Sequence, residues 1–320
     1  MAVTKIADVI QPELFAQSVI ERTAEKNEII NAGVIENNPL LDQLITGGGT
    51  VLTMPKWGDL TGESEVLSDS AALTPANIAA KSELATLLIR GKAWGSNELA
   101  GALAGDDPMR AIATLVSDWW IRDEKKQVIN ILNGVFAATS MSGLVSDISG
   151  GSDGSEKISA NAVLDAKQLM GDAADLLTMI YMHSAVFTAL QKQNVIQFIP
   201  VAESKIQIPT YLGYRVLVDD SAPESTGVYT TYLLSRGAIQ RGVGTPASLT
   251  EVEMDRDSLA STDYFINRQA KVLHPKGVSW IGSANITGAT PTNAELATGT
   301  NWERKADIKK IGMVKLVHKI

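Results

Sequence analysis

The stretch YLGYRVLVDDSAP, from Tyr211 to Pro223, raises the main question about this chain. It is apolar up to Val218 and then presents two adjacent carboxylates, Asp219 and Asp220. A strand that ends in carboxylates is typical of an enzyme, because ligands often bind where the strands of a sheet end. The question is whether these aspartates serve catalysis or only end a strand.

A catalytic triad can be composed from residues in three parts of the chain. Ser152 lies in GGSDG, which matches the nucleophile-elbow pattern G-x-S-x-G, and Ser152, Asp219 and His274 follow the chain order of α/β-hydrolases. That pattern has weight only between a strand and a helix. Here the serine lies in a run of Ser, Gly and Asp, and the next helix is expected no earlier than about Ser159.

Each of these residues also has a simpler interpretation. Asp side chains favour turns because they bond to nearby backbone, so Asp219 and Asp220 are expected to end a strand at a turn. His274 precedes a turn that contains proline, and we expect a structural histidine there. We therefore predict no catalytic residue. A serine hydrolase using Ser152, Asp219 and His274 stays open as an alternative.

The composition excludes several other classes of function. Among 320 residues there is no cysteine, so disulfides, thiolate metal sites and cysteine nucleophiles are excluded. The three histidines are far apart, and neither a P-loop, a dinucleotide fingerprint nor a calcium loop is present. We predict no metal site and no cofactor. The net charge of −8 argues against a nucleic-acid reader, because phosphate binding needs clustered Lys and Arg.

The length and the apolar content bound the architecture. A chain of 320 residues, 45% of them hydrophobic, is long enough for about two domains with packed cores. The N-terminal sequence lacks the apolar region of a signal peptide, and no uncharged apolar run approaches the roughly 20 residues of a membrane span. We expect a soluble protein of the reducing cytosol, without a membrane partner.

The first third contains two segments with little core of their own. Pro12 and Gly33 bracket a rather polar helix, which is expected to dock on something else. The segment from Gly47 to Trp94 has strand-like runs at Val51–Trp57 and Glu83–Trp94, around a middle rich in small and polar residues. Such a two-stranded excursion is marginal in water, so its burial must come from elsewhere, such as a neighbouring subunit.

The strongest helix signal follows. Asp106 and Asp107 are N-cap candidates before Pro108, and the apolar periodicity predicts a helix of roughly 27 residues, with Gly134 near its end. Its charged stretch RDEKK is expected to be a solvated patch, or else a contact with another subunit. The Trp119–Trp120 pair is expected to serve packing.

Beyond the linker SDISGGSDGSEK the pattern becomes α/β. Two short helices are expected, one capped by Ser159 and running to about Asp172, the other capped by Ser184. Strands are expected at LLTMIYM, KIQIP, YRVLV and VYTTYLL. From Leu249 to Trp280 the chain is mostly extended, and the C-terminal KKIGMVKLVHKI is strand-like.

Taken in order, these pieces resemble a major capsid protein of a tailed bacteriophage with the HK97-like fold. The resemblance is carried by YLGYRVLVDDSAP, YTTYLLSRGAIQRG and VEMDRDSLASTDYFINRQAKVLHPKGVSW, and supported by IYMHSAVFTALQK and NWERKADIKKIGMVKLVHKI. It implies an α+β fold with four parts: an N-terminal arm, a long extended loop, a peripheral domain with a spine helix, and an α/β axial domain. They would be residues 1–33 for the arm, 47–94 for the loop, 34–46, 95–150 and about 245–320 for the peripheral domain, and 151–244 for the axial domain.

The resemblance implies a structural function. Copies of the chain would form pentamers and hexamers of an icosahedral virion shell, assembled in the host cytoplasm around DNA that is not bound sequence-specifically. A separate scaffolding protein, a portal protein and, as in some members, decoration proteins would be partners. No residue matches the lysine–asparagine cross-link of some members. Two further alternatives are an encapsulin, a bacterial compartment of the same fold, and a monomeric binding module.

Overall fold

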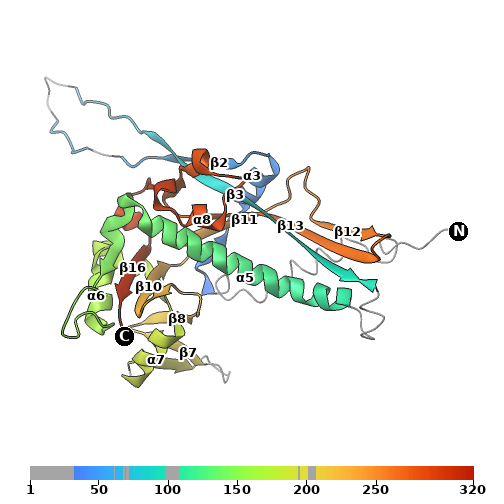
Figure 1. Cartoon of the computed structure of the whole chain (residues 1–320). Helices are drawn as coiled ribbons and strands as arrows, with labels where there is room; N and C mark the ends of the chain where they lie inside the picture. Colours follow the sequence, from blue (N-terminus) through green and yellow to red (C-terminus); the bar gives the residue numbers. More distant parts are fainter. Residues whose placement is uncertain are drawn as a thin grey trace.

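The computed structural model describes residues 32–60, 62–67, 69, 72–98, 108–193, 195–200 and 207–320. The helix expected after Pro12 lies outside the described residues. In the described part, two large sheets and one long helix form the framework, which confirms the expected α+β class (Figure 1).

The first sheet has six strands in the order β1–β11–β13–β3–β2, with β12 paired to β13. Its members are β1 (Ile35–Asn37), β2 (Val51–Trp57), β3 (Ala80–Asn97), β11 (Ile239–Val243), β12 (Val252–Asp257) and β13 (Thr262–Pro275). The two strands expected around the small-residue segment are confirmed as β2 and β3, although β3 is longer at both ends. The extended character expected after Leu249 is confirmed by β12 and β13.

The 18-residue strand β3 belongs to two different parts of this sheet. Residues 80–86 pair with β2, and residues 87–97 pair with β13. We call β2 with the first part of β3 the ribbon, and β12, β13 and residues 87–97 of β3 the finger. Figure 1 shows the ribbon and the finger pointing to opposite sides of the molecule.

The second sheet has eight strands in the order β4–β16–β10–β5–β8–β7–β6, with β9 paired to β10. Its members are β4 (Val145–Asp147), β5 (Leu177–Met182), β6 (Gln197–Pro200), β7 (Gln207–Tyr211), β8 (Tyr214–Val218), β9 (Glu224–Ser225), β10 (Val228–Ser235) and β16 (Met313–His318). The strands expected at LLTMIYM, YRVLV and VYTTYLL are confirmed as β5, β8 and β10; of the expected KIQIP strand, the described part from Gln207 onward lies in β7, and its first two residues lie outside the described residues. The C-terminal strand β16 lies between β4 and β10, so the end of the chain returns to this sheet.

The remaining elements are short. They are the helices α3 (Pro39–Thr46), α6 (Ala160–Gln168), α7 (Ser184–Lys192) and α8 (Asn293–Leu296), the strand pair β14 (Val278–Trp280) and β15 (Trp302–Arg304), and the 3-10 turns η2 (Thr139–Leu144), η3 (Gly171–Leu176), η4 (Gly282–Asn285), η5 (Gly299–Asn301) and η6 (Ile308–Lys310).

The two short helices of the α/β part differ from expectation at one end each. Ser159 caps α6 as expected, with its Oγ accepting from the backbone N–H of Ala162 at 3.2 Å, but the α-helix ends at Gln168. Gly171, with φ of 58°, then opens a 3-10 turn, a backbone conformation that glycine tolerates. The cap of α7 is His183 rather than Ser184, because the extended His183 aims its Nδ1 at the N–H of Ala185.

The long helix expected after Pro108 is confirmed as α5 (Pro108–Ala137), 30 residues or about 45 Å. Its Trp119 and Trp120 serve packing, as expected: their rings meet edge to face at 4.8 Å, and Trp119 meets Trp94 of β3 in the same way at 5.5 Å. This aromatic group fixes the first half of α5 on the finger.

Gly134 lies in the last turn of α5, near the helix end as expected. A Cβ at this position would stand 2.0 Å from the carbonyl oxygen of Leu296 and 2.6 Å from the indole nitrogen of Trp302. Glycine is needed here because the backbone of α5 approaches α8 and β15 too closely for any side chain. The second half of α5 is therefore packed into the main core, which extends to the eight-stranded sheet.

Candidate assembly interface

The ribbon carries apolar side chains that the chain itself does not cover. Its two strands pair from Val51 to Trp57 against Ala80 to Thr86. Beyond Trp57, in the loop of residues 58–79, Val66 is 93% exposed and Leu67 is 81% exposed. Leu60, Leu73 and Ile78 are exposed as well. Because soluble chains rarely gather exposed large apolar residues in one segment, this loop is a candidate contact surface.

The same loop is acidic. Between Lys56 and Lys81 the sequence has no basic residue, and it has four carboxylates: Asp59, Glu63, Glu65 and Asp69. In Figure 1 the described parts of the loop project away from the body of the molecule. A partner of this loop therefore needs apolar surface and positive charge.

The root of the ribbon is fixed to the body by Glu83. One carboxylate oxygen pairs with Lys56 Nζ on β2 at 3.0 Å, and the other lies 3.3 Å from His274 Nε2 on β13. The second oxygen also accepts from the backbone N–H of Gly277 at 3.4 Å. The hydrogen bond with His274 and the nearby Lys56 outweigh burial and lower the pKa of Glu83 to about 2.

Two further contacts set the direction of the ribbon. The backbone N–H of Leu84 donates to Ser279 Oγ at 3.1 Å, which joins β3 to β14. Further out, Lys310 Nζ pairs with Asp59 at 2.7 Å. The ribbon is thus held at its root by buried bonds and near its loop by an exposed ion pair.

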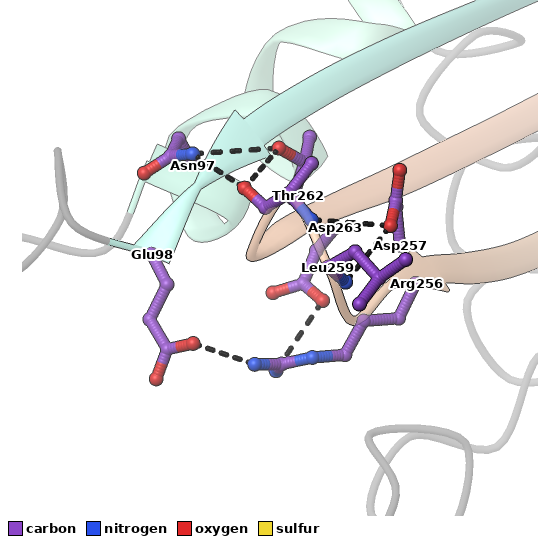
Figure 2. Close-up of polar contacts among 8 residues, drawn as sticks. Asn97, Glu98, Arg256, Asp257, Leu259, Thr262 and Asp263 are labelled. Carbon is purple, nitrogen blue, oxygen red and sulfur yellow. Dashed lines mark hydrogen bonds and ion pairs between the residues drawn. The ribbon is translucent and has the colours of Figure 1, made fainter.

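The tip of the finger is a tight turn between β12 and β13 (Figure 2). Asp257 Oδ1 accepts from the backbone N–H groups of Leu259 and Ala260 at 2.9 and 3.1 Å. Arg256 bridges Glu98 at 2.5 Å and Asp263 at 3.5 Å, so it ties β12 to β13 and to the end of β3. At the turn Leu259 is fully exposed. These polar contacts stabilise the turn, and the turn presents the exposed side chain of Leu259 to solvent.

A buried group of charges lies where α5 crosses the six-stranded sheet. Glu124 of α5 is 1% exposed. Its carboxylate lies 2.9 Å from Nε and 3.1 Å from Nη2 of Arg241 on β11, and 3.4 Å from Nζ of Lys271 on β13. Burial acts to raise the pKa of Glu124, but Lys271 and Arg241 outweigh it and lower the pKa below its ordinary value. Burial lowers the pKa of Lys271.

This cluster corrects one expectation from the sequence. The stretch RDEKK was expected to be a solvated patch or a contact with another subunit. Instead, its side chains are divided between the exposed face of α5 and the face that packs on the sheet. Arg122 and Lys126 are exposed, whereas Glu124 is buried against the sheet. Lys125 pairs with Asp219 at 3.1 Å and so joins α5 to the eight-stranded sheet. Helical spacing placed one of the five charges on the inner face, where two cations from distant strands neutralise it.

The three residues of the hypothetical triad lie in different settings. Ser152 is exposed, between β4 and α6, and only its carbonyl takes part in a described bond, from Ser155 Oγ. Asp219 follows β8 and accepts from the N–H of Ser221 at 3.0 Å, the turn expected there. His274 lies on the other large sheet, buried against Glu83. Among the interactions of the described residues, none joins two of the three.

Other kinds of site find no support in the described part of the chain. There, no group of three or more His, Asp or Glu side chains could hold a metal ion. Within the same residues, no helix is both long enough and apolar enough to cross a membrane. The surfaces that stand out are the ribbon loop and the finger, both suited to contact with other chains.

Known structures share this architecture. The capsid of Ralstonia phage GP4 superposes with a TM-score of 0.58 at 8% identity, over 89% of this chain and 87% of that one. The capsid of cyanophage Pam1 gives 0.52 at 12% identity, over 85% of each chain. An encapsulin from Synechococcus elongatus gives 0.50 at 11% identity, over 75% and 77%. The fold is therefore the HK97-like fold of shell-forming proteins.

Sequence comparison shows which family of shell-forming proteins this chain is similar to. The family model described as "Major capsid protein 13-like" matches residues 108–313. The major capsid protein of Bacillus phage SPP1 is 43% identical over 327 aligned positions, which cover 100% of this chain and 99% of that protein. The chain belongs to the major capsid protein 13-like family. It is a structural subunit of a phage capsid, not an enzyme, and its copies assemble into the shell of the virion.

Proposed function

We propose that this chain forms pentamers and hexamers that close into an icosahedral head around a DNA genome. The observation that carries the proposal is the 43% identity to a phage major capsid protein over the whole chain. The uncovered surfaces support it. The ribbon loop and the turn of the finger expose large apolar side chains, which is unfavourable for a monomer in water. In a shell, neighbouring copies would bury these side chains.

We propose a division of labour among the parts of the fold. Residues 1–33 would be the N-terminal arm and 47–94 the extended loop. Residues 34–46, 95–150 and about 245–320 would form the peripheral domain around α5, and 151–244 the axial domain. The strands β4 and β16 complete the sheet to which most of residues 151–244 belong. In this division, α5 is the rigid spine that carries both the finger and the eight-stranded sheet.

The proposed mechanism is binding spread over large surfaces. Burying apolar area contributes roughly 25 cal/mol for each Å², so modest contacts at the loop and the finger add up over several neighbours. Heterologous contacts close into rings when the rotation between copies divides a full turn. Flexibility between pentamers and hexamers would come from the ribbon, since its outer fastening is the exposed Lys310–Asp59 pair.

We propose a separate scaffolding protein, a portal protein and decoration proteins as partners, with assembly in the host cytoplasm. We also propose that DNA is enclosed rather than gripped. A net charge of −8 provides no excess of cations for tight phosphate binding. Filter binding of duplex DNA to the unassembled subunit should show weak affinity, and a tight affinity that falls steeply with salt would contradict this part.

The test of assembly is sedimentation velocity of the purified protein, with negative-stain images of the fast fraction. We expect shells, or rings of five and six copies, alone or with a coexpressed scaffolding protein. A chain that stayed monomeric with crowding agents and scaffold present would overturn the proposal.

An encapsulin is the second candidate, favoured by the structural match to a compartment protein of this fold. The contents of purified shells separate the two candidates. DNA packaged during infection supports the phage head, whereas a defined cargo enzyme in shells from uninfected cells supports the compartment.

A further inference from the structure

Glycine directly follows an aspartate or asparagine at two places in the chain. They are Asp153–Gly154, in the loop between β4 and α6, and Asn133–Gly134, in the last turn of α5. At such a pair the backbone nitrogen of the glycine can attack the side-chain carbonyl carbon and close a five-membered succinimide ring. Glycine favours this step, because it has no Cβ to obstruct the approach and it adopts backbone conformations that other residues avoid.

Of the two pairs, Asn133–Gly134 is the more reactive by chemistry alone, since an amide loses ammonia more readily than a carboxyl group loses water at neutral pH. The structure protects it. Gly134 lies within the regular hydrogen bonding of α5, and Asn133 Oδ1 accepts from the hydroxyl of Tyr232 at 2.8 Å. The backbone of Leu296 also packs directly on Gly134. Ring closure would require α5 to unwind against its own core, so the folded chain should not react here.

Asp153–Gly154 lies in the opposite setting. Both residues are exposed, and both have positive φ angles, 64° and 90°. No described atom beyond the adjacent residues lies within 4 Å of the position that a Cβ on Gly154 would occupy. Among the interactions of the described residues, none engages the carboxyl group of Asp153. This side chain is therefore free to turn towards the backbone nitrogen of Gly154.

The loop that carries this pair is held in place at both ends. The N–H of Ile148 donates to the carbonyl of Val317 at 2.9 Å, and the N–H of Ile158 donates to the carbonyl of Lys319 at 3.0 Å. The N–H of Lys319 in turn donates to the carbonyl of Glu156 at 2.7 Å. The C-terminal end of the chain therefore fixes the backbone of Glu156 close to the exposed turn.

The side chain of Glu156 reaches back to one of the reacting atoms. Its Oε2 accepts from the backbone N–H of Gly154 at 3.0 Å. This N–H lies in the plane of the amide, whereas the nitrogen attacks a carbonyl carbon from the face of that plane, so the hydrogen bond does not block the attack. A carboxylate in this position can take the proton that the nitrogen must lose, which is the role of a general base.

We propose that Asp153 isomerises spontaneously to isoaspartate in the folded subunit, with Glu156 as the general base. The carboxyl of Asp153 reacts in its protonated form. The bond between Gly154 N and Asp153 Cγ forms, and Glu156 takes the amide proton and returns it to the departing hydroxyl, which leaves as water. Water then opens the succinimide at either carbonyl. Attack at Cγ restores aspartate, whereas attack at the backbone carbonyl leaves the main chain running through Cγ, one carbon longer.

Prolonged incubation of the full-length subunit at neutral pH and body temperature tests this site. Protein isoaspartyl methyltransferase labels isoaspartate, and electron-transfer fragmentation of the peptides shows at which residue it lies. We expect isoaspartate at position 153, in at least tenfold excess over position 133. Asp153→Glu, which would have to close a six-membered ring, is the matched control and should remove the signal. Less isoaspartate at position 153 than at position 133, or none at position 153, would overturn the proposal.

Unfolding separates the effect of the structure from that of the sequence. In concentrated urea the order of the two pairs should reverse, because Asn133 loses the protection of α5 and Asp153 loses the fixed position of Glu156. An unchanged order in urea would show that the fold does not select the site, and would contradict the inference.

A second substitution tests the general base. Glu156→Gln keeps an oxygen for the N–H of Gly154 but cannot take its proton, so isomerisation at Asp153 should slow at least fivefold. Glu63→Gln, an exposed carboxylate of the ribbon loop, is the control for the loss of one charge, and circular dichroism melting should show that both variants fold. An unchanged or faster rate in Glu156→Gln would exclude this role of Glu156. None of these measurements requires assembly, so a negative result leaves the proposed shell function intact.

Discussion

Glu83 of β3 lies 3.3 Å from His274 of β13, and this contact fastens the most projecting part of the molecule to the centre of its six-stranded sheet. Because an ionised carboxylate can only accept, the imidazole donates through Nε2. Lys56 approaches the other oxygen from β2, so Glu83 links both strands of the ribbon to the body. The residue considered as a catalytic base thus has a mechanical role.

Replacing Glu83 with Gln should destabilise the subunit by about 1.5–3 kcal/mol, since hydrogen bonds to a charged group are lost. The effect depends on pH. The pKa of Glu83 is lowered from 4.5 to about 2, so its stabilisation is present above about pH 4.5 and is lost as the pH falls through about 2. Urea unfolding of the unassembled subunit should show a gap between the unaltered chain and Glu83→Gln that closes over this range. A gap unchanged at pH 2 would contradict the role of the carboxylate.

The buried cluster of Glu124, Arg241 and Lys271 predicts an asymmetry between two substitutions. Glu124→Gln removes the carboxylate that pairs with the buried Lys271 and the partly buried Arg241, and should cost about 3–5 kcal/mol. Lys271→Met leaves the ion pair of Glu124 and Arg241, with its hydrogen bond from Nη2 to Oε2, intact and should cost clearly less. Chemical denaturation of both unassembled variants measures the order. Equal losses, or a larger loss for Lys271→Met, would show that the charge balance does not govern this crossing.

Gly134→Ala should be among the most damaging single substitutions in the chain. The added methyl group would stand 2.0 Å from the carbonyl oxygen of Leu296, so α5 must move away from α8. We expect a loss of at least about 2 kcal/mol, although alanine is the better helix former by about 1 kcal/mol. Ala137→Gly, at the end of the same helix, is the control for propensity. A thermal melt in which Gly134→Ala stabilised the subunit would rule out the close packing.

Val66→Ser and Leu67→Ser should separate folding from assembly. Both side chains are almost fully exposed, so the unfolding free energy of the unassembled subunit should change by less than about 0.5 kcal/mol. The concentration needed for assembly should rise, because apolar area that a neighbour would cover is removed. Light scattering against subunit concentration measures it. Unchanged assembly by the double variant would exclude these side chains from any contact.

Ser152→Ala should change neither melting nor assembly, because the hydroxyl makes no described bond and only the carbonyl of Ser152 holds the turn. An esterase assay with a chromogenic ester serves as the control. Activity in the unaltered chain that Ser152→Ala abolished would revive the hydrolase alternative.

Much of the fold follows from local pattern. Apolar periodicity and capping residues predict several elements correctly. These are the strands at Val51–Trp57, Tyr214–Val218 and Met313–His318, the start of α5 at Pro108 and the cap of α6 at Ser159. The cap at His183 was missed because histidine is not an expected cap. Gly134 lies near the helix end as predicted, but the reason for a glycine there is the carbonyl group of Leu296, 162 positions away, which the sequence does not show.

The buried charges that join the ribbon and α5 to the six-stranded sheet were not predicted from the sequence. Glu83 and Lys271 do interrupt apolar runs, in ELATLLI and QAKVL, and a charge within such a run is the one local signal of a buried partner. The identity of that partner is not local, since His274 and Glu124 are brought close only by strand pairing and by the crossing of α5. Likewise, no periodicity indicates that β3 changes partner at Leu87.

The sequence by itself determined the class of this protein: an α+β chain without cysteine chemistry, with a long helix, a two-stranded excursion and the ordered motifs of a capsid subunit. Those features are local, since they depend on residue type and on spacing within a few turns or strands. The tertiary structure alone decided which charges are buried, how the ribbon is fastened and where β3 changes partner. These depend on contacts between residues far apart in the chain, which form only when the sheets and α5 pack together.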